Sequence, residues 1–132
     1  MATIGIDRAP ADVGDYLGEV PNLPAWTRFF RRVSPIPGRD HYEVETVMGT
    51  IETWIEASGE PGGPLIRSIT SLIGGRREQA VLRLSPELGG SATSVEFTVR
   101  LPAGTPPDRA AGQRTAMTEE LRRLKGLLEQ VG

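Results

Sequence analysis

The chain has 132 residues, of which 38% are hydrophobic and 24% charged, and its formal net charge is −2. This composition is that of one ordinary folded domain, and its slight acidity offers no positive field that would attract nucleic acid or anionic lipid. Cysteine is absent, which excludes disulfides, thiolate catalysis and cysteine metal sites, and no motif of a zinc triad or a Ser-His-Asp triad surrounds the single histidine, His41.

The first residues lack the basic region and apolar run of a signal peptide, and eighteen consecutive apolar residues occur nowhere. We therefore expect a cytoplasmic protein without stable membrane insertion. We also expect it to bind no nucleic acid, metal or cofactor, while its oligomeric state stays open.

The N-terminal part predicts a short strand followed by two small helices. Residues 3–7 alternate apolar and polar side chains, as a half-buried strand does. Pro10 favours a helix start, and apolar residues within 13–20 recur at helical spacing. Asn22 can cap one further turn, which presents Trp26 on one side.

Residues 29–101 predict about six strands, because strand-like runs alternate with turns rich in Gly and Pro. Two runs, 40–48 and 94–101, have one face richer in apolar side chains. These faces consist of Tyr42, Val44, Thr46 and Met48, and of Val95, Phe97, Val99 and Leu101. The alternation indicates an antiparallel sheet with one buried face and one wet face.

A long helix is predicted from Pro106 to Gln130, with a length of about 37 Å at 1.5 Å per residue. Thr105 can cap its N-terminus, and Asp108 favours the positive end of the helix dipole. Its stripe consists of Met117, Leu121, Leu124, Leu128 and Val131, extended backward by Ala110 and Gln113. Such a helix is long enough to cross a whole sheet.

Together these elements predict one α+β domain over residues 1–132 with a helix-grip fold. A curved antiparallel sheet of about seven strands would wrap around the long C-terminal helix, with two small helices near the N-terminus. The segments APADV (9–13), VPNLPAW (20–26) and MTEELRRLK (117–125) are similar to the opening and closing helices of the START-like, or SRPBCC, superfamily. This superfamily includes polyketide cyclases and lipid-transfer domains, and the resemblance covers essentially the whole chain.

The resemblance implies a cavity between the concave sheet face and the long helix, and strand parity indicates which residues would line it. They are Tyr42, Val44, Thr46, Phe97 and Val99 from the sheet, Gln113 and Met117 from the helix, and Trp26 and Phe30 at the mouth. The alternative, that the same side chains interdigitate as a dry core, stays open.

Polar groups that face such a cavity would orient a ligand or transfer a proton. Glu78 shares a strand face with Ala80 and is predicted to point inward near the sheet edge. Arg67, on the preceding strand, would either pair with Glu78 or make only a solvated cross-strand contact, and we favour the second. Gln113 on the helix stripe would offer its amide to a ligand carbonyl.

The strand at residues 51–56 has a large apolar side chain on each face. If Ile51 and Ile55 point inward, Trp54 lies on the outer face, whereas a β-bulge would reverse this parity. His41, beside a turn on the polar face, is expected to be exposed.

We expect the chain to bind a small hydrophobic molecule, polyketide-like, aromatic or lipid-like, in this cavity. The alternative is an enzyme of the polyketide cyclase or dehydratase type, with Glu78 or Tyr42 as acid or base and Arg67 or Gln113 as electrostatic partner. A third possibility is a protein-interaction module with a vestigial cavity. Binding is favoured over catalysis because no inward acid–base pair is evident.

The cyclase branch of the superfamily relies on an arginine and on a tyrosine. This chain has Ser58 at the place of the arginine, and Val33 or one of its neighbours at the place of the tyrosine. The resemblance therefore does not extend to cyclase chemistry.

Overall fold

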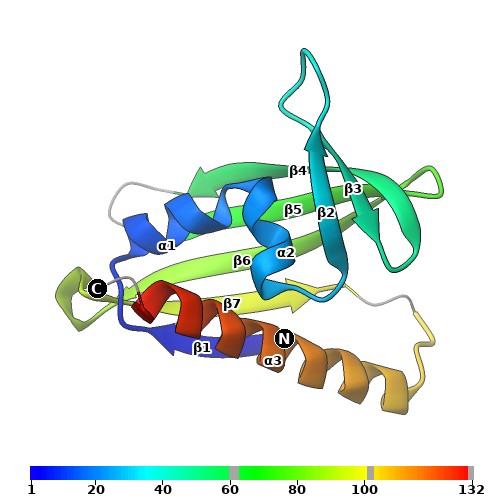
Figure 1. Cartoon of the computed structure of the whole chain (residues 1–132). Helices are drawn as coiled ribbons and strands as arrows, with labels where there is room; N and C mark the ends of the chain where they lie inside the picture. The colour runs from blue at the N-terminus through cyan, green and yellow to red at the C-terminus, as the bar shows by residue number, and fades with distance from the viewer. Residues whose placement is uncertain (60–62, 101–102, 131–132) are drawn as a thin grey trace.

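The computed structural model describes residues 1–59, 63–100 and 103–130. Within these residues, seven strands form one antiparallel sheet in the order β1-β7-β6-β5-β4-β3-β2 (Figure 1). The elements are β1 (Ala2–Ile6), α1 (Pro10–Leu17), α2 (Leu23–Trp26), β2 (Phe30–Pro35), β3 (Tyr42–Thr46), β4 (Gly49–Gly59), β5 (Leu65–Ile73), β6 (Arg76–Glu87), β7 (Ala92–Val99) and α3 (Pro107–Gln130). The predicted α+β class, strand number and long C-terminal helix are confirmed.

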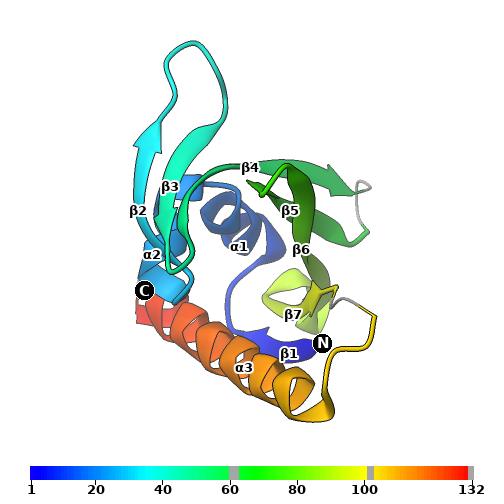
Figure 2. The same cartoon turned by 90° about the vertical axis from the view of Figure 1, so that its right-hand side faces the viewer.

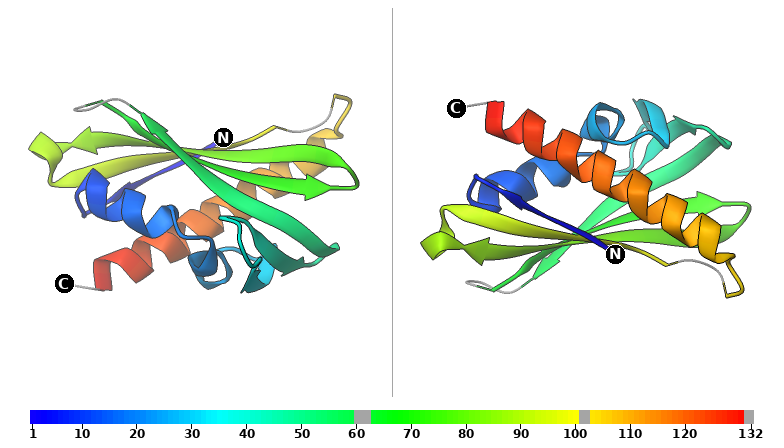
Figure 3. Two further views of the ribbon diagram at one scale, coloured as in Figure 1. Left: turned by 90° about the horizontal axis from the view of Figure 1, so that it is seen from above. Right: turned by 90° about the horizontal axis from the view of Figure 1, so that it is seen from below.

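The sheet is strongly curved, so that β2 and β3 at one end face β7 and β1 at the other (Figure 2). Helix α1 packs on the concave face against β5 and β6, and α3 lies beside β1 and contacts α2. Figure 3 shows α3 crossing the molecule obliquely on the side that the sheet leaves open. The concave face, α1 and α3 therefore enclose the core.

Strand parity is as the alternation predicts, except that Met48, predicted to face the core, is 70% exposed in the β3–β4 turn. Leu82 of β6 lies opposite Phe97 of β7, and both side chains are buried on the concave face. Val44 of β3 is also fully buried, whereas its neighbours Glu43 and Glu45 are exposed on the other face. The sheet thus has one face against the helices and one toward solvent.

The stripe predicted for the C-terminal helix forms its contact with the core. The buried side chains of α3 are Met117, Leu121, Leu124 and Leu128. They belong to the same core as the fully buried Trp26 ring, which meets the Phe97 ring edge to face with centroids 5.7 Å apart. Val131 and Leu101, also predicted to be apolar contacts, lie outside the described residues.

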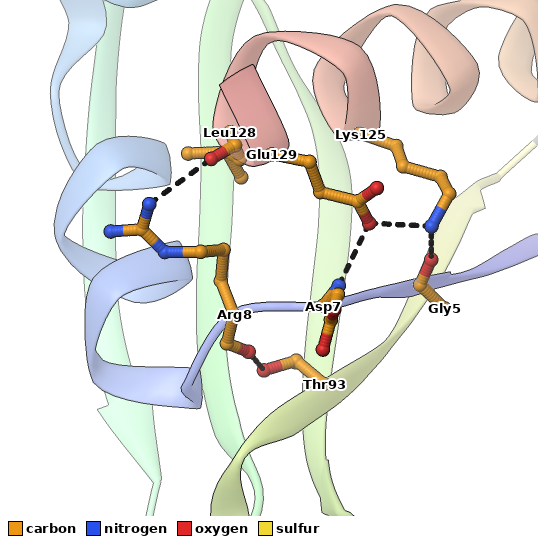
Figure 4. A network of polar contacts seen from close by, with 7 residues as sticks. All are labelled: Gly5, Asp7, Arg8, Thr93, Lys125, Leu128 and Glu129. Atoms are coloured by element: carbon orange, nitrogen blue, oxygen red, sulfur yellow. Dashed lines mark hydrogen bonds and ion pairs between the residues drawn. The ribbon is translucent and has the colours of Figure 1, made fainter. Parts of the chain in front are cut away.

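Polar contacts join the C-terminal half of α3 to β1, which is an edge strand (Figure 4). Lys125 Nζ donates to the carbonyl of Gly5 at 2.8 Å, and Glu129 Oε2 accepts from the backbone N–H of Asp7 at 2.8 Å. Arg8 Nη1 also donates to the carbonyl of Leu128 at 3.2 Å. Because an open strand edge invites pairing with other chains, α3 both completes the core and protects this edge.

In the part of the chain that the structure describes, no helix combines the length and the apolar character needed to cross a membrane.

Candidate ligand-binding pocket

A mostly apolar pocket of about 250 Å³ lies between the concave face of the sheet, the connection from α2 to β2, and α3. Its lining residues are Thr27, Phe29, Phe30, Ile69, Ser71, Glu78, Gln79, Ala80, Phe97, Val99, Gln113 and Glu120. Small side chains help to leave this space: Ala80 lies opposite Val99, and Ser71 opposite Glu78. The first buried side chain of α3 is Met117, so the helix turns before it do not fill the pocket.

Four of the residues predicted to bind a ligand line this pocket: Phe30, Phe97, Val99 and Gln113. Phe97 is buried, Phe30 and Val99 are half-buried, and Gln113 is exposed on the first half of α3. The prediction of a cavity among these side chains agrees with the structure. No ligand contact tests their role, which stays a prediction.

The other predicted lining residues lie elsewhere. Trp26, Val44 and Met117 are buried in the core, at 0%, 0% and 2% exposed. The expectation that Trp26 lies at the mouth is wrong, because its ring packs behind the pocket wall on Phe97. For these three residues the dry-core alternative holds.

Tyr42 and Thr46 lie toward the β2–β3 end of the concave face. Tyr42 is half-buried against the core, and Thr46 Oγ1 donates to the carbonyl of Gly49 at 2.7 Å, in the β3–β4 turn. Neither residue is part of the pocket lining. The geometry therefore gives no support to Tyr42 as an acid or base for a molecule in the pocket.

Glu78 points to the concave side, as predicted, and lines the pocket with 45% of its side chain exposed. Its expected neighbour Arg67 is not beside it, because the register sets Glu78 opposite Ser71 and Arg67 opposite Leu82. Four residues along a strand correspond to about 13 Å. The considered Arg67–Glu78 contact is therefore not formed.

Arg67 instead holds α1 against the sheet. Its Nε donates to the carbonyl of Gly14 at 3.0 Å, near the C-terminal end of α1, where a positive charge is favourable. The approach is close, since a Cβ built on Gly14 would lie 2.9 Å from Arg67 Nη2. This geometry indicates a structural role for Arg67, away from the pocket.

Glu120 of α3 is a pocket residue that the sequence reasoning missed. Its Oε2 accepts a hydrogen bond from the backbone N–H of Arg28 at 3.0 Å. Burial raises the pKa of the Glu120 carboxyl, while this hydrogen bond and the charges of Arg123 and Arg28 oppose the rise. A helical signal was present, since Glu120 follows Met117 by three residues and Gln113 by seven, which places all three on one helix face.

The outer sheet face holds a separate aromatic cluster. Trp54 lies there, and Thr53 beside it is fully buried on the concave face, so the parity without a bulge is correct. The His41 ring stacks on Trp54 with centroids 4.2 Å apart, and His41 Nδ1 lies 2.7 Å from Glu52 Oε2. The expectation that His41 is exposed is wrong, because this stacking leaves it half-buried.

No protein-family model matches the sequence, and no curated protein matches it. Several solved structures resemble it. An uncharacterized protein from Bacillus thuringiensis superposes with a TM-score of 0.65 at 15% identity, over 96% of this chain and 95% of that one. A START superfamily protein from Mycobacterium smegmatis gives a TM-score of 0.61 at 12% identity, over 98% and 96%. DynU16, a protein in the dynemicin biosynthetic locus, gives 0.58 at 16% identity, over 96% of this chain and 45% of that one.

Identities this low indicate a shared fold. The strand order, the small helices on the concave side and the long closing helix agree with these likenesses. The chain therefore has the START-like, helix-grip fold.

Proposed function

We propose that the protein binds a small hydrophobic molecule, polyketide-like, aromatic or lipid-like, in the pocket between the sheet and α3. The main support is the pocket itself, which is mostly apolar and has three phenyl rings in its wall, those of Phe29, Phe30 and Phe97. Ligand sites are typically concave and apolar with a few polar groups that orient the ligand. Here those polar groups are Gln113, Glu120 and Glu78.

The size of the pocket favours a compact ligand. Its volume of about 250 Å³ lies just below the roughly 300–1,000 Å³ of most small-molecule sites. Aromatic compounds of one or two rings fit this space better than a long-chain lipid. The structural neighbour DynU16, from the dynemicin biosynthetic locus, associates a protein of this fold with the biosynthesis of a small molecule.

Naphthylmethanol, a neutral bicyclic alcohol, tests this proposal in a calorimetric titration of the full chain. We expect a dissociation constant in the micromolar range. Val99→Trp should abolish the binding, because Val99 lines the pocket and the indole would occupy it. Overpacking of this kind costs about 1–3 kcal/mol of stability.

The matched control is Thr98→Trp, the neighbouring position on β7, which is exposed on the outer face. This variant should bind naphthylmethanol as the parent does. Equal affinity of the folded Val99→Trp variant would place the ligand outside the pocket and contradict the proposal.

The second candidate function is that of an enzyme of the cyclase or dehydratase type, which would act on a ligand in the same pocket. Its support is Glu120, since a carboxyl with a raised pKa at a pocket is a candidate acid or base. Turnover of a polyketide-like substrate by the parent and by Glu120→Gln separates the two candidates. If the protein is an enzyme, the parent should turn over the substrate and the variant should not. If it is a binding protein, neither should show turnover.

A further inference from the structure

The charged groups of the pocket all have one sign. Among the described residues that line it, Glu78 of β6 and Glu120 of α3 are carboxylates, and no lysine, arginine or histidine takes part. Two guanidinium groups lie near these carboxylates but are not part of the lining. Arg76 Nη2 is 4.0 Å from Glu78 Oε1 with 80% of its side chain exposed, and Arg28 Nη2 is 3.2 Å from Glu119 Oε2 with 67% of its side chain exposed. A ligand in the pocket therefore meets hydrogen-bond acceptors and negative charge.

The aromatic side chains of the pocket wall also favour a positively charged ligand. The rings of Phe29 and Phe30 pack edge to face with centroids 5.0 Å apart, and Phe97 faces the pocket from β7. Faces of aromatic rings attract organic cations, and the attraction increases when the cation is removed from water. Phenyl rings combined with carboxylates form a site for a positively charged, partly apolar molecule.

We propose that the pocket takes a small organic amine in its ammonium form, with the apolar body among the phenyl rings and the ammonium group at Glu120. This inference rests on the proposed function and specifies the ligand class for the same site. The second carboxylate, Glu78, lies on the facing wall, where its exposed partner Arg76 offsets part of its charge.

The position of Glu120 supports this assignment over a fatty acid or phosphate ligand. Its carboxylate accepts one backbone hydrogen bond, yet burial still disfavours its charge, so an entering cation would compensate that charge. An anionic head group would add a third negative charge to a pocket that contains no cationic side chain among the residues described. Like-charge juxtaposition in such a site opposes binding.

Three compounds with the same ring system and different head groups test the inference: naphthylmethylamine, naphthylmethanol and naphthoate. In calorimetric titrations of the full chain at neutral pH, we expect the amine to bind about tenfold more tightly than the alcohol. Naphthoate should bind most weakly. An amine that binds no better than the alcohol, or a carboxylate that binds better than the amine, overturns the inference and leaves the proposed function standing. If none of the three binds, both fall.

Variants of adjacent carboxylates show which charge recognises the amine. Glu120→Gln keeps the size and an acceptor for the Arg28 N–H, so it should reduce affinity for the amine about tenfold while affinity for the alcohol is unchanged. The matched control is Glu119→Gln, since Glu119 is exposed and does not line the pocket. It should leave both affinities as in the parent. Retention of the amine preference in both Glu120→Gln and Glu78→Gln overturns the proposal.

Discussion

Glu120 Oε2 accepts a hydrogen bond from the backbone N–H of Arg28 at 3.0 Å, which joins α3 to the connection between α2 and β2. The preceding residue, Glu119, pairs with the side chain of the same Arg28. Two successive carboxylates thus hold one residue at the rim of the pocket. Glu120 lines the pocket and Glu119 does not.

Glu120→Gln should stabilise the fold at neutral pH. Burial raises the pKa of Glu120 above its ordinary value of 4.5, so above that pH the unfolded chain ionises more readily than the native one and native stability is reduced. The variant removes this penalty, so its melting temperature at pH 7 should exceed that of the parent. Below the ordinary value both states are protonated and the difference should disappear. Thermal unfolding followed by circular dichroism at both pH values measures this, and a variant less stable at pH 7 contradicts it.

Glu129→Gln should have the opposite effect. The hydrogen bond from Lys125, together with the N–H of Asp7, lowers the pKa of Glu129 below its ordinary value of 4.5 (Figure 4). Its charged form therefore stabilises the fold above pH 4.5, and this contribution is lost as pH falls through the lowered pKa. The variant should melt below the parent at pH 7 and approach it in acid. The same loss at every pH would show that the charge is not responsible.

Leu124 tests the closing helix. Its side chain is 0% exposed in the core, so Leu124→Ala should destabilise the fold by about 2–5 kcal/mol, as large-to-small core substitutions do. Leu127, on the same helix, is only half-buried at the edge of the core and provides the control. Leu127→Ala should cost clearly less in urea unfolding. Equal losses would mean that α3 packs by a different face.

The indole N–H signals of the two tryptophans report where a ligand binds. Trp26 packs on Phe97, which lines the pocket, whereas Trp54 stacks on His41 at the outer face. Naphthylmethanol should therefore shift the Trp26 signal in a ¹⁵N-correlated NMR spectrum and leave the Trp54 signal in place. Trp54→Phe assigns the two signals. A shift of the Trp54 signal alone would locate the ligand on the outer face.

The elements and the direction of their side chains could be predicted from the sequence, because both depend on local periodicity. The alternation through Phe97 and Val99 indicated the concave face of β7, and the spacing of Met117, Leu121 and Leu124 indicated the buried face of α3. These repeats of two and of about 3.6 residues follow from backbone geometry, so they hold before any tertiary contact exists. The α+β class and five pocket residues could be predicted in this way: Phe30, Glu78, Phe97, Val99 and Gln113.

Contacts between distant segments were decided by the tertiary structure alone. The register of β5 and β6 sets Glu78 opposite Ser71, and it separates Glu78 from Arg67, although each residue has the predicted parity. Trp26 lies in the core and not at the pocket mouth, whereas Glu120 lies at the pocket. Both positions depend on where α3 crosses the sheet and on where along α3 the buried side chains begin. Local periodicity determines on which face of its own helix or strand a side chain lies. The distance between side chains of different elements depends on how whole elements pack, and that packing is a property of the complete fold.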